Sequence, residues 1–278
     1  AVHVLLGLAL VTGAVPVACE EPAATAPADS TGGGGLRPLH DAFHGVKTVV
    51  GDGLHIISSP LRMSGRDALR AGGYLAATGV IMIWDEEIPD AFRRNRDEFP
   101  LKPLVEVGRF LDPLGYGNMN VYWLGGLGVS YLARWDTGTA MFGQIVESFA
   151  IYGVLRIAAI ELTGRRRPYQ AESAYEFGED DATSFPSGHT INVFQLATVI
   201  SHHVNRPGFT WGAYFGAGCV ALQRIESRSH WASDVFLSAV AGTAISRAVI
   251  GLHEERRQAR LVPHVSRQGV GAALAWRF

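Results

Sequence analysis

The chain is poor in cysteine, in charged residues and in long uncharged apolar runs. Cys19 and Cys219 are the only two cysteines, so neither a disulfide framework nor a zinc-type spacing can be inferred. Charged residues make up 18% of the 278 residues, and the formal net charge is only −2. Because the sequence also has no basic stripe and no aromatic ladder, we predict no nucleic-acid partner. Cys219 lies in an apolar stretch and is expected to be a small buried side chain.

No apolar segment of the helical region is long and uncharged enough to be a clear membrane span. A spanning helix needs about 20 mostly apolar residues. The segment 139–162 contains Glu147 and Arg156, and the segment 232–255 carries Arg247 near its middle. A charge at the centre of a bilayer costs at least about 2.5 kcal/mol. We therefore favour a bundle that is water-soluble or peripherally bound to a membrane over a polytopic protein.

The N-terminal residues have the composition of an export segment. An apolar run ends at Cys19, and a stretch rich in Ala, Pro, Ser and Gly follows it. This order predicts a signal peptide or lipoprotein signal over 1–19 and a flexible linker over 20–35. Pro16 stands where a lipoprotein signal has Leu or a similar residue, so we favour simple cleavage over a lipid anchor at Cys19, and either over a retained anchor helix. The protein is expected to be exported and periplasmic or envelope-associated.

Helical periodicity dominates the rest of the chain and predicts an all-α domain over 36–262. Alternation typical of strands is almost absent there. After Pro263, apolar residues alternate with small or polar ones, which predicts a strand-like tail over 263–278, a short strand or hairpin folded back on the bundle. The segments with helical spacing are 66–84, 102–111, 118–135, 139–162, 189–204, 210–224 and 232–255.

Two polar sequence blocks are suited to binding phosphate. The first, Gly164-Arg165-Arg166-Arg167-Pro168, offers guanidinium groups that match phosphate oxygens, although alone it is typical of a solvated helix end. The second runs from Ser184 through Pro186, Ser187 and Gly188 to His189 and opens an apolar helix. The free amides of a helix start bind anions, and a histidine on the first turn could donate a proton to the bound group. Without the other blocks, His189 would be interpreted as a solvent-exposed histidine at the start of a helix.

The third block contains Arg224, His230 and Asp234. His230 and Asp234 are four residues apart, so on a helix they share one face, and the carboxylate can accept the proton of one ring nitrogen. The other nitrogen would then be free to act as a nucleophile. An isolated pair of this kind is more often a surface hydrogen bond.

The three blocks together resemble the signature of the type 2 phosphatidic acid phosphatase (PAP2) and vanadium haloperoxidase superfamily. The resemblance lies in the order and separation of Arg-Pro, Pro-Ser-Gly-His and Arg-x5-His-x3-Asp. The resemblance covers about 156–249, which we take as the motif core. It implies a helical bundle in which Arg167 and Arg224 hold the phosphoryl oxygens, together with Ser187 and the backbone amide of Gly188.

The resemblance also implies catalytic roles. His230 would attack phosphorus, Asp234 would orient His230, and His189 would protonate the leaving alkoxide and later activate water. No metal and no cofactor is expected in this scheme. The implied activity is hydrolysis of phosphate monoesters or lipid phosphates through a phosphohistidine.

Two positions depart from the family pattern. The first block normally opens with a lysine seven residues before the arginine of Arg-Pro, and Ile160 stands there in this chain. Arg156 lies one helical turn earlier on the same face, and we hypothesise that it replaces the missing cation. Gln223 replaces a serine before Arg224, which is a milder change.

Two other functions stay open at this point. A vanadium-dependent haloperoxidase would use the same cavity for vanadate, and a non-catalytic protein could bind phosphate or a lipid headgroup there. The substrate is expected to be a phosphorylated lipid or a phosphorylated small molecule, and the sequence does not select between them. It also leaves open the oligomeric state.

Overall fold

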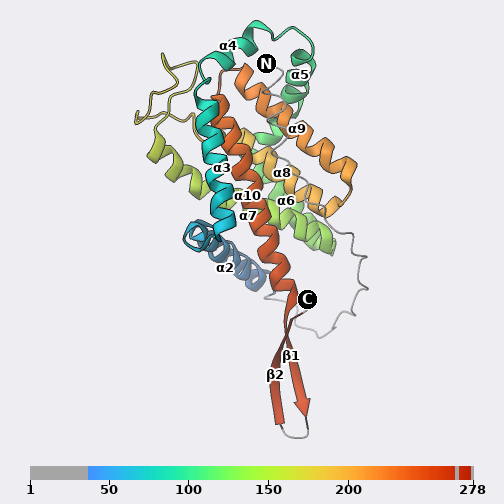
Figure 1. Cartoon of the computed structure of the whole chain (residues 1–278). Helices are drawn as coiled ribbons and strands as arrows, with labels where there is room; N and C mark the ends of the chain where they lie inside the picture. Colours follow the sequence, from blue (N-terminus) through green and yellow to red (C-terminus); the bar gives the residue numbers. More distant parts are fainter. Residues whose placement is uncertain (1–36, 267–268, 277–278) are drawn as a thin grey trace.

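The structure is a computed structural model that describes residues 37–266 and 269–276. The predicted signal over 1–19, with Cys19, and the predicted linker over 20–35 lie outside the described residues. The described chain is a helical bundle followed by one hairpin (Figure 1), which confirms the predicted all-α class. Its elements are, in order, α2 (Arg37–Ile57), η1 (Ser59–Arg62), α3 (Gly65–Met82), α4 (Glu87–Arg94), α5 (Leu101–Leu111), η2 (Asp112–Gly115), η3 (Gly117–Met119), α6 (Asn120–Leu132), α7 (Asp136–Thr163), α8 (Gly188–Val204), α9 (Pro207–Glu226), α10 (Ala232–Gln258), β1 (Ala259–Ser266) and β2 (Gly269–Trp276).

Local sequence explains where the helices next to the site begin and end. Helix α7 ends at Gly164, whose φ of 48° is left-handed and favours glycine. A Cβ atom there would lie 2.7 Å from the backbone nitrogen of Glu179, so the following loop can fold closely against the helix end. Helix α8 also ends in a left-handed residue, Asn205, and Pro207 opens α9. All seven predicted helical segments exist, whereas α2 and the short α4 lie outside them.

Helix α8 is central to the core. Its apolar side chains contribute to all three buried clusters and contact α7, α9 and α10. Helix α10 approaches α8 closely at Gly242, where a Cβ atom would lie 2.7 Å from the carbonyl oxygen of Ile191. Cys219 of α9 is buried in this core, as predicted. The core therefore fixes the start of α8, which carries the second polar block, relative to α9 and α10. Those two helices carry Arg224 and Asp234 of the third block.

The C-terminal residues form an antiparallel hairpin in which Ala259 pairs with Trp276 and Ser266 with Gly269. The predicted hairpin is confirmed, but β1 begins at Ala259 rather than at 263. The expectation that it folds back on the bundle is wrong, because the hairpin extends away from the helices (Figure 1). Helix α10 continues without a break to Gln258, so β1 leaves along the direction of that helix. The two strands pair with each other, which satisfies the backbone groups on their inner edges without the bundle.

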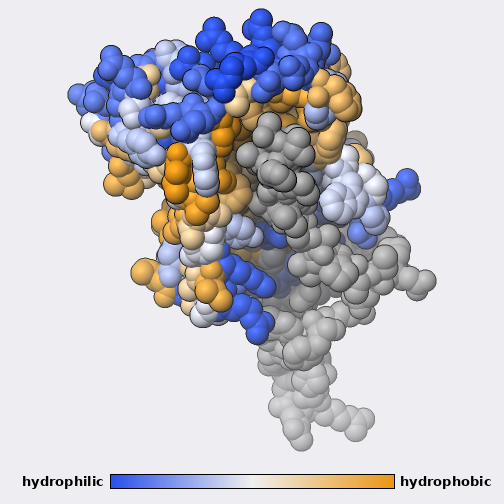
Figure 2. Space-filling model, turned by 45° about the horizontal axis from the view of Figure 1, so that its top comes forward, coloured by the Kyte–Doolittle hydropathy of each residue, from blue (hydrophilic) through white to orange (hydrophobic). Residues whose placement is uncertain are grey.

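The bundle exposes much apolar surface. Figure 2 shows hydrophilic residues gathered at one end of the molecule and hydrophobic residues on the sides below it. Among the described residues, the segment Ala232–Arg257 is the one helix whose length and hydropathy suit a membrane span, and half of its most apolar window is buried inside the bundle. Soluble monomers rarely expose large contiguous apolar patches. The exposed large apolar residues of α3, α6 and α7 are Leu69, Tyr74, Leu75, Val80, Val121, Tyr122, Leu124, Val129, Tyr131, Leu132, Val154, Ile157 and Leu162.

Candidate active site

A cavity of about 350 Å³ brings the three polar blocks together. Its wall contains Arg167 from the first block, Gly188 and His189 from the second, and Arg224 and His230 from the third. These residues span more than sixty positions of the chain, and they meet as the sequence predicts. The rest of the wall consists of Gly115, Gly117, Asn120, Phe149, Tyr152, Gly153, Arg156, Thr183, Pro186 and Asn192.

Backbone hydrogen bonds hold the loops that carry these blocks. The amide of Ser184 donates to the carbonyl of Arg165 at 2.9 Å, which ties the second block to the first. The amide of His230 donates to the carbonyl of Arg224 at 3.3 Å, which closes the turn between α9 and α10. The reactive groups therefore lie on helix ends and short, internally bonded loops, an arrangement that limits their movement.

His230 is oriented by a backbone carbonyl. Its side chain is almost completely buried, and Nδ1 donates to the carbonyl of Ser184 at 2.5 Å. Since a carbonyl accepts only, this bond fixes the proton on Nδ1 and leaves Nε2 with a free lone pair. Because His230 lines the cavity, Nε2 is the nitrogen suited to attack a bound group.

Asp234 does not accept the proton of His230, and this part of the sequence interpretation is wrong. Its two carboxylate oxygens accept from Arg165 Nη1 at 2.5 Å and from Ser184 Oγ at 2.6 Å. The spacing of four residues brings side chains together only within one helix, but α10 begins at Ala232, after His230. Asp234 therefore acts on His230 indirectly, by fixing Ser184, whose carbonyl holds the imidazole.

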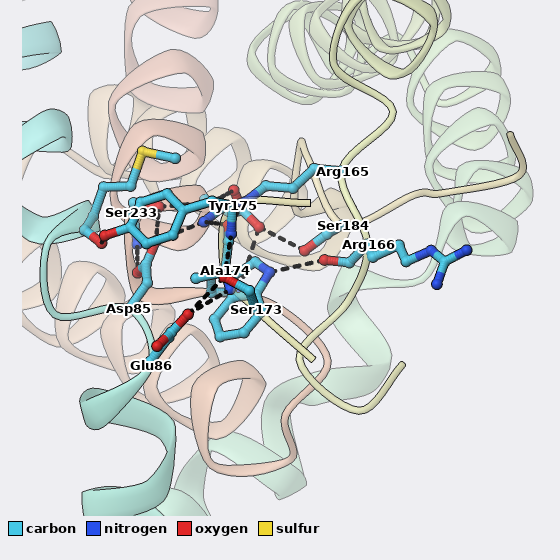
Figure 3. Close-up of polar contacts among 12 residues, drawn as sticks. Asp85, Glu86, Arg165, Arg166, Ser173, Ala174, Tyr175, Ser184 and Ser233 are labelled. Carbon is cyan, nitrogen blue, oxygen red and sulfur yellow. Dashed lines mark hydrogen bonds and ion pairs between the residues drawn. The ribbon is translucent and has the colours of Figure 1, made fainter. Parts of the chain in front are cut away.

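Arg165 is the centre of a buried polar cluster (Figure 3). It donates to Asp85 Oδ2 and to Ser233 Oγ, both at 2.8 Å, in addition to Asp234. The side chain of Arg166 points away from this cluster (Figure 3) and pairs with Glu179 at 3.0 Å. The three consecutive arginines therefore have separate positions, since Arg165 is buried, Arg166 is exposed and Arg167 lines the cavity. Sequence reasoning missed the role of Arg165 because a run of three arginines does not indicate which of them is buried. It missed Asp85 because this residue reaches the cluster only through a long-range contact.

His189 has a carboxylate neighbour that sequence reasoning also missed. Asp112 Oδ1 lies 3.9 Å from His189 Nε2 and 3.0 Å from Arg224 Nη2. The ring of Tyr116 meets the imidazole of His189 edge-on, with 4.9 Å between the ring centroids. In the sequence, Asp112 is recognisable only as the first residue of an Asp-Pro turn, a signal that predicts a bend and no site.

The structure places Ser187 and Arg156 differently with respect to the cavity. The Ser187 hydroxyl is buried and hydrogen-bonds to the Thr190 hydroxyl at 2.9 Å, and Ser187 is not among the lining residues. Arg156 does line the cavity, beside Tyr152. Burial raises the pKa of Tyr152 to about 12, while the charge of Arg156 acts in the opposite direction. Arg156 is thus a guanidinium in the cavity wall in addition to Arg167 and Arg224.

Both histidines of the cavity are neutral at pH 7. Burial, followed by the charge of Arg167, lowers the pKa of His230 to about 3. Burial, followed by the charge of Arg224, lowers the pKa of His189 to about 4. The arginines that lower these pKa values also make the cavity positive, so it is suited to an anion. An anion bound there would offset the arginine charge and raise the pKa of both imidazoles.

These pKa values predict that the fold loses stability in acid. Between about pH 6.5 and pH 4 the unfolded chain binds protons at both histidines and the folded chain does not, so the free energy of unfolding falls as the pH falls. Each histidine contributes a slope of up to about 1.4 kcal/mol per pH unit. Denaturant unfolding of wild type and His230→Gln across this range checks the prediction. The slope of the variant should be shallower, and equal slopes would contradict the assignment of a depressed pKa to His230.

Comparison with known proteins finds similarity to one family. The model of the PAP2 superfamily matches residues 143–258, a range that contains all three polar blocks. This range is therefore similar to the PAP2 superfamily, and it carries most of the residues that line the cavity. The chain is also similar to a lipid A 1-phosphatase of Porphyromonas gingivalis, with 35% identity over 66 residues. This match covers 23% of the chain and only 15% of that relative.

Two solved structures are similar to this chain. LpxE of Aquifex aeolicus is 23% identical, with a TM-score of 0.42, over 58% of this chain and 93% of that one. A transmembrane PAP2 type phosphatidylglycerolphosphate phosphatase from Bacillus subtilis is 21% identical, with a TM-score of 0.44, over 78% of this chain and 98% of that one.

Proposed function

We propose that this protein is a phosphatase that hydrolyses a phosphate monoester, with a phosphorylated lipid as the favoured substrate class. The observation that carries the proposal is the position of His230. Its imidazole is neutral, has Nε2 as the unprotonated nitrogen because Nδ1 donates to Ser184, and lies in a wall that also contains Arg167 and Arg224. A neutral nucleophile beside fixed cations is what in-line attack on a phosphoryl group requires.

In the proposed reaction, the guanidinium groups of Arg167 and Arg224 bind the phosphoryl oxygens. His230 Nε2 forms a bond to phosphorus as the bond from phosphorus to the ester oxygen breaks, and His189 donates a proton to the departing alkoxide. A water molecule then gives its proton to His189 and attacks phosphorus, and the phosphorus–nitrogen bond breaks. Inorganic phosphate leaves and His230 is restored. The bound phosphate raises the pKa of His189, so that its protonated form exists in the complex.

A lipid substrate is supported by the apolar surface around the bundle. Apolar side chains exposed on α3, α6 and α7 would contact the acyl region of a membrane, where a lipid phosphate is available. The similarity to a lipid A 1-phosphatase points the same way. We also propose that the protein acts outside the cytoplasm at the cell envelope, as the composition of 1–35 suggests.

An assay of phosphate release tests the proposal directly. The full chain in detergent should release inorganic phosphate from lipid phosphates, and vanadate should inhibit it by occupying the same cavity. Lipid monophosphates, lipid diphosphates and soluble monoesters are compared with and without detergent. A protein that oxidises bromide with vanadate and peroxide but releases no phosphate would be a haloperoxidase. A protein that binds phosphate without turnover, and binds it equally well as His230→Ala, would be a binding protein.

Arg156 should contribute to substrate binding in place of the lysine absent at Ile160. Arg156→Ala removes one of the three cavity guanidiniums, so we expect kcat/KM to fall by about tenfold to a hundredfold, and Arg156→Lys to recover part of the loss. Arg166→Ala is the matched control, because Arg166 is exposed and outside the cavity wall. If Arg156→Ala turns over substrate like wild type, the compensation hypothesis is wrong.

Asp112 should raise the pKa of His189, the proposed proton donor. Its negative charge raises the pKa of His189 against the effects of burial and Arg224, so Asp112→Asn should lower that pKa further. We expect kcat to fall by about tenfold and the pH at which kcat declines on the alkaline side to move toward acid. The pH dependence of kcat measures this shift. A lower kcat with an unchanged pH profile would show that Asp112 acts only by holding Arg224.

A further inference from the structure

A second group of ionisable side chains lies where α2, α7 and α10 meet. It consists of Asp52 on α2, Glu147 on α7 and His253 on α10. One ligand atom of each lies within 4.8 Å of those of the other two. His253 is nineteen residues beyond Asp234 in α10, which corresponds to about 28 Å along the helix. None of the three residues lines the phosphate cavity, although Glu147 precedes the lining residue Phe149 by two positions on α7. The proposed role of the cluster does not depend on the proposed phosphatase function.

Glu147 is the residue that points to a ligand. Its side chain is only 4% exposed, and Oε2 lies 2.7 Å from His253 Nε2. The other carboxylate oxygen, Oε1, is buried and accepts no hydrogen bond from a donor group within the described part of the chain, and the carboxyl group of Asp52 lies close to that of Glu147. A buried carboxylate oxygen without a partner is strongly unfavourable unless a proton or a cation occupies the space next to it. Asp52, also buried, adds a second carboxylate at this point.

The donor set suits one class of cation. Two carboxylates and one imidazole bind divalent transition-metal ions, with zinc as a common choice, whereas magnesium and calcium prefer oxygen ligands alone. Ligand atoms around a tetrahedral ion with bonds of about 2.1 Å lie about 3.4 Å apart, so the three residues need to close by up to about 1.4 Å. Arg256 contacts Asp52 and would hold that carboxylate from outside, as residues behind metal ligands commonly do.

We propose that Asp52, Glu147 and His253 form a structural binding site for a zinc-like divalent ion. The ion would join the first described helix, α2, to the two long helices α7 and α10. It would also balance the second carboxylate, because Arg256 neutralises only one of the two. The site has no part in phosphate chemistry, so the ion stabilises the fold and leaves the reacting groups unchanged.

Titration of the chelator-treated full chain with Co²⁺ and Zn²⁺ tests this site. We expect saturable binding of one ion per chain, visible absorption bands for Co²⁺, and a thermal unfolding midpoint about 3 °C higher or more with Zn²⁺. His253→Asn and Glu147→Gln should each weaken binding at least about tenfold. His253→Asn is the safer variant, because its side chain is partly exposed and its replacement is small.

Glu254→Gln is the matched control, since Glu254 is the neighbour of His253 but pairs with His202 at the surface. It should bind Co²⁺ like wild type. The proposal is overturned if no saturable binding is detected, or if His253→Asn binds as tightly as wild type. It is equally overturned if His202→Gln removes the binding, which would place the ion at the adjacent histidines of α8.

Discussion

Replacing His230 by alanine is expected to lower kcat by at least about a thousandfold. The variant lacks the nitrogen that attacks phosphorus, whereas the arginines that bind phosphate remain in the cavity wall. Inorganic phosphate should therefore still bind within a few-fold of the wild-type affinity. Steady-state phosphate release gives kcat, and calorimetry gives the affinity.

A second measurement separates loss of the nucleophile from loss of structure. In His189→Asn the residue proposed to activate water is missing. With an activated monoester whose leaving group needs no proton, a phosphoryl group should therefore accumulate on His230 and be detectable by mass spectrometry after rapid alkaline quench. His202→Gln is the control, because His202 lies on the surface of α8 and outside the cavity wall. Should His230→Ala retain more than a tenth of wild-type turnover, His230 is not the nucleophile.

Replacing Arg165 by methionine is expected to cause the largest loss of stability among single changes near the site. Arg165 is almost fully buried and bonded to Asp85 and Asp234, which are equally buried. Removal of one member of a buried ionic network leaves the others charged and unpaired, which costs about 3–5 kcal/mol. Denaturant unfolding in the detergent used for the wild type measures the difference.

Arg166→Ala is the control for Arg165, because it changes the same residue type at the next position. The Arg166 side chain is 44% exposed, and its pairs with Glu176 and Glu179 lie at the surface. Its free energy of unfolding should therefore differ from wild type by no more than about 1 kcal/mol. Equal losses in the two variants would contradict the separate positions that the structure assigns to these arginines.

The sequence by itself determined the helical class, the main helices and the arginines and histidines that line the cavity. Long apolar stretches without strand alternation identified the segments that became α3 and α5 to α10, because helices packed within a bundle consist largely of apolar residues. The blocks around Arg167, His189 and His230 were recognisable because phosphate chemistry restricts both the residue types and their spacing. The match of 143–258 to the model of the PAP2 superfamily agrees with that interpretation.

Tertiary structure decided the partners of these residues. The pairing of Asp234 with Arg165 rather than with His230 depends on where α10 begins, and Asp85 and Asp112 reach the site from helices and turns far away in the chain. Single residues that act through long-range contacts leave no periodic or local pattern. The same holds for Asp52, Glu147 and His253, whose meeting follows only from the packing of α2, α7 and α10.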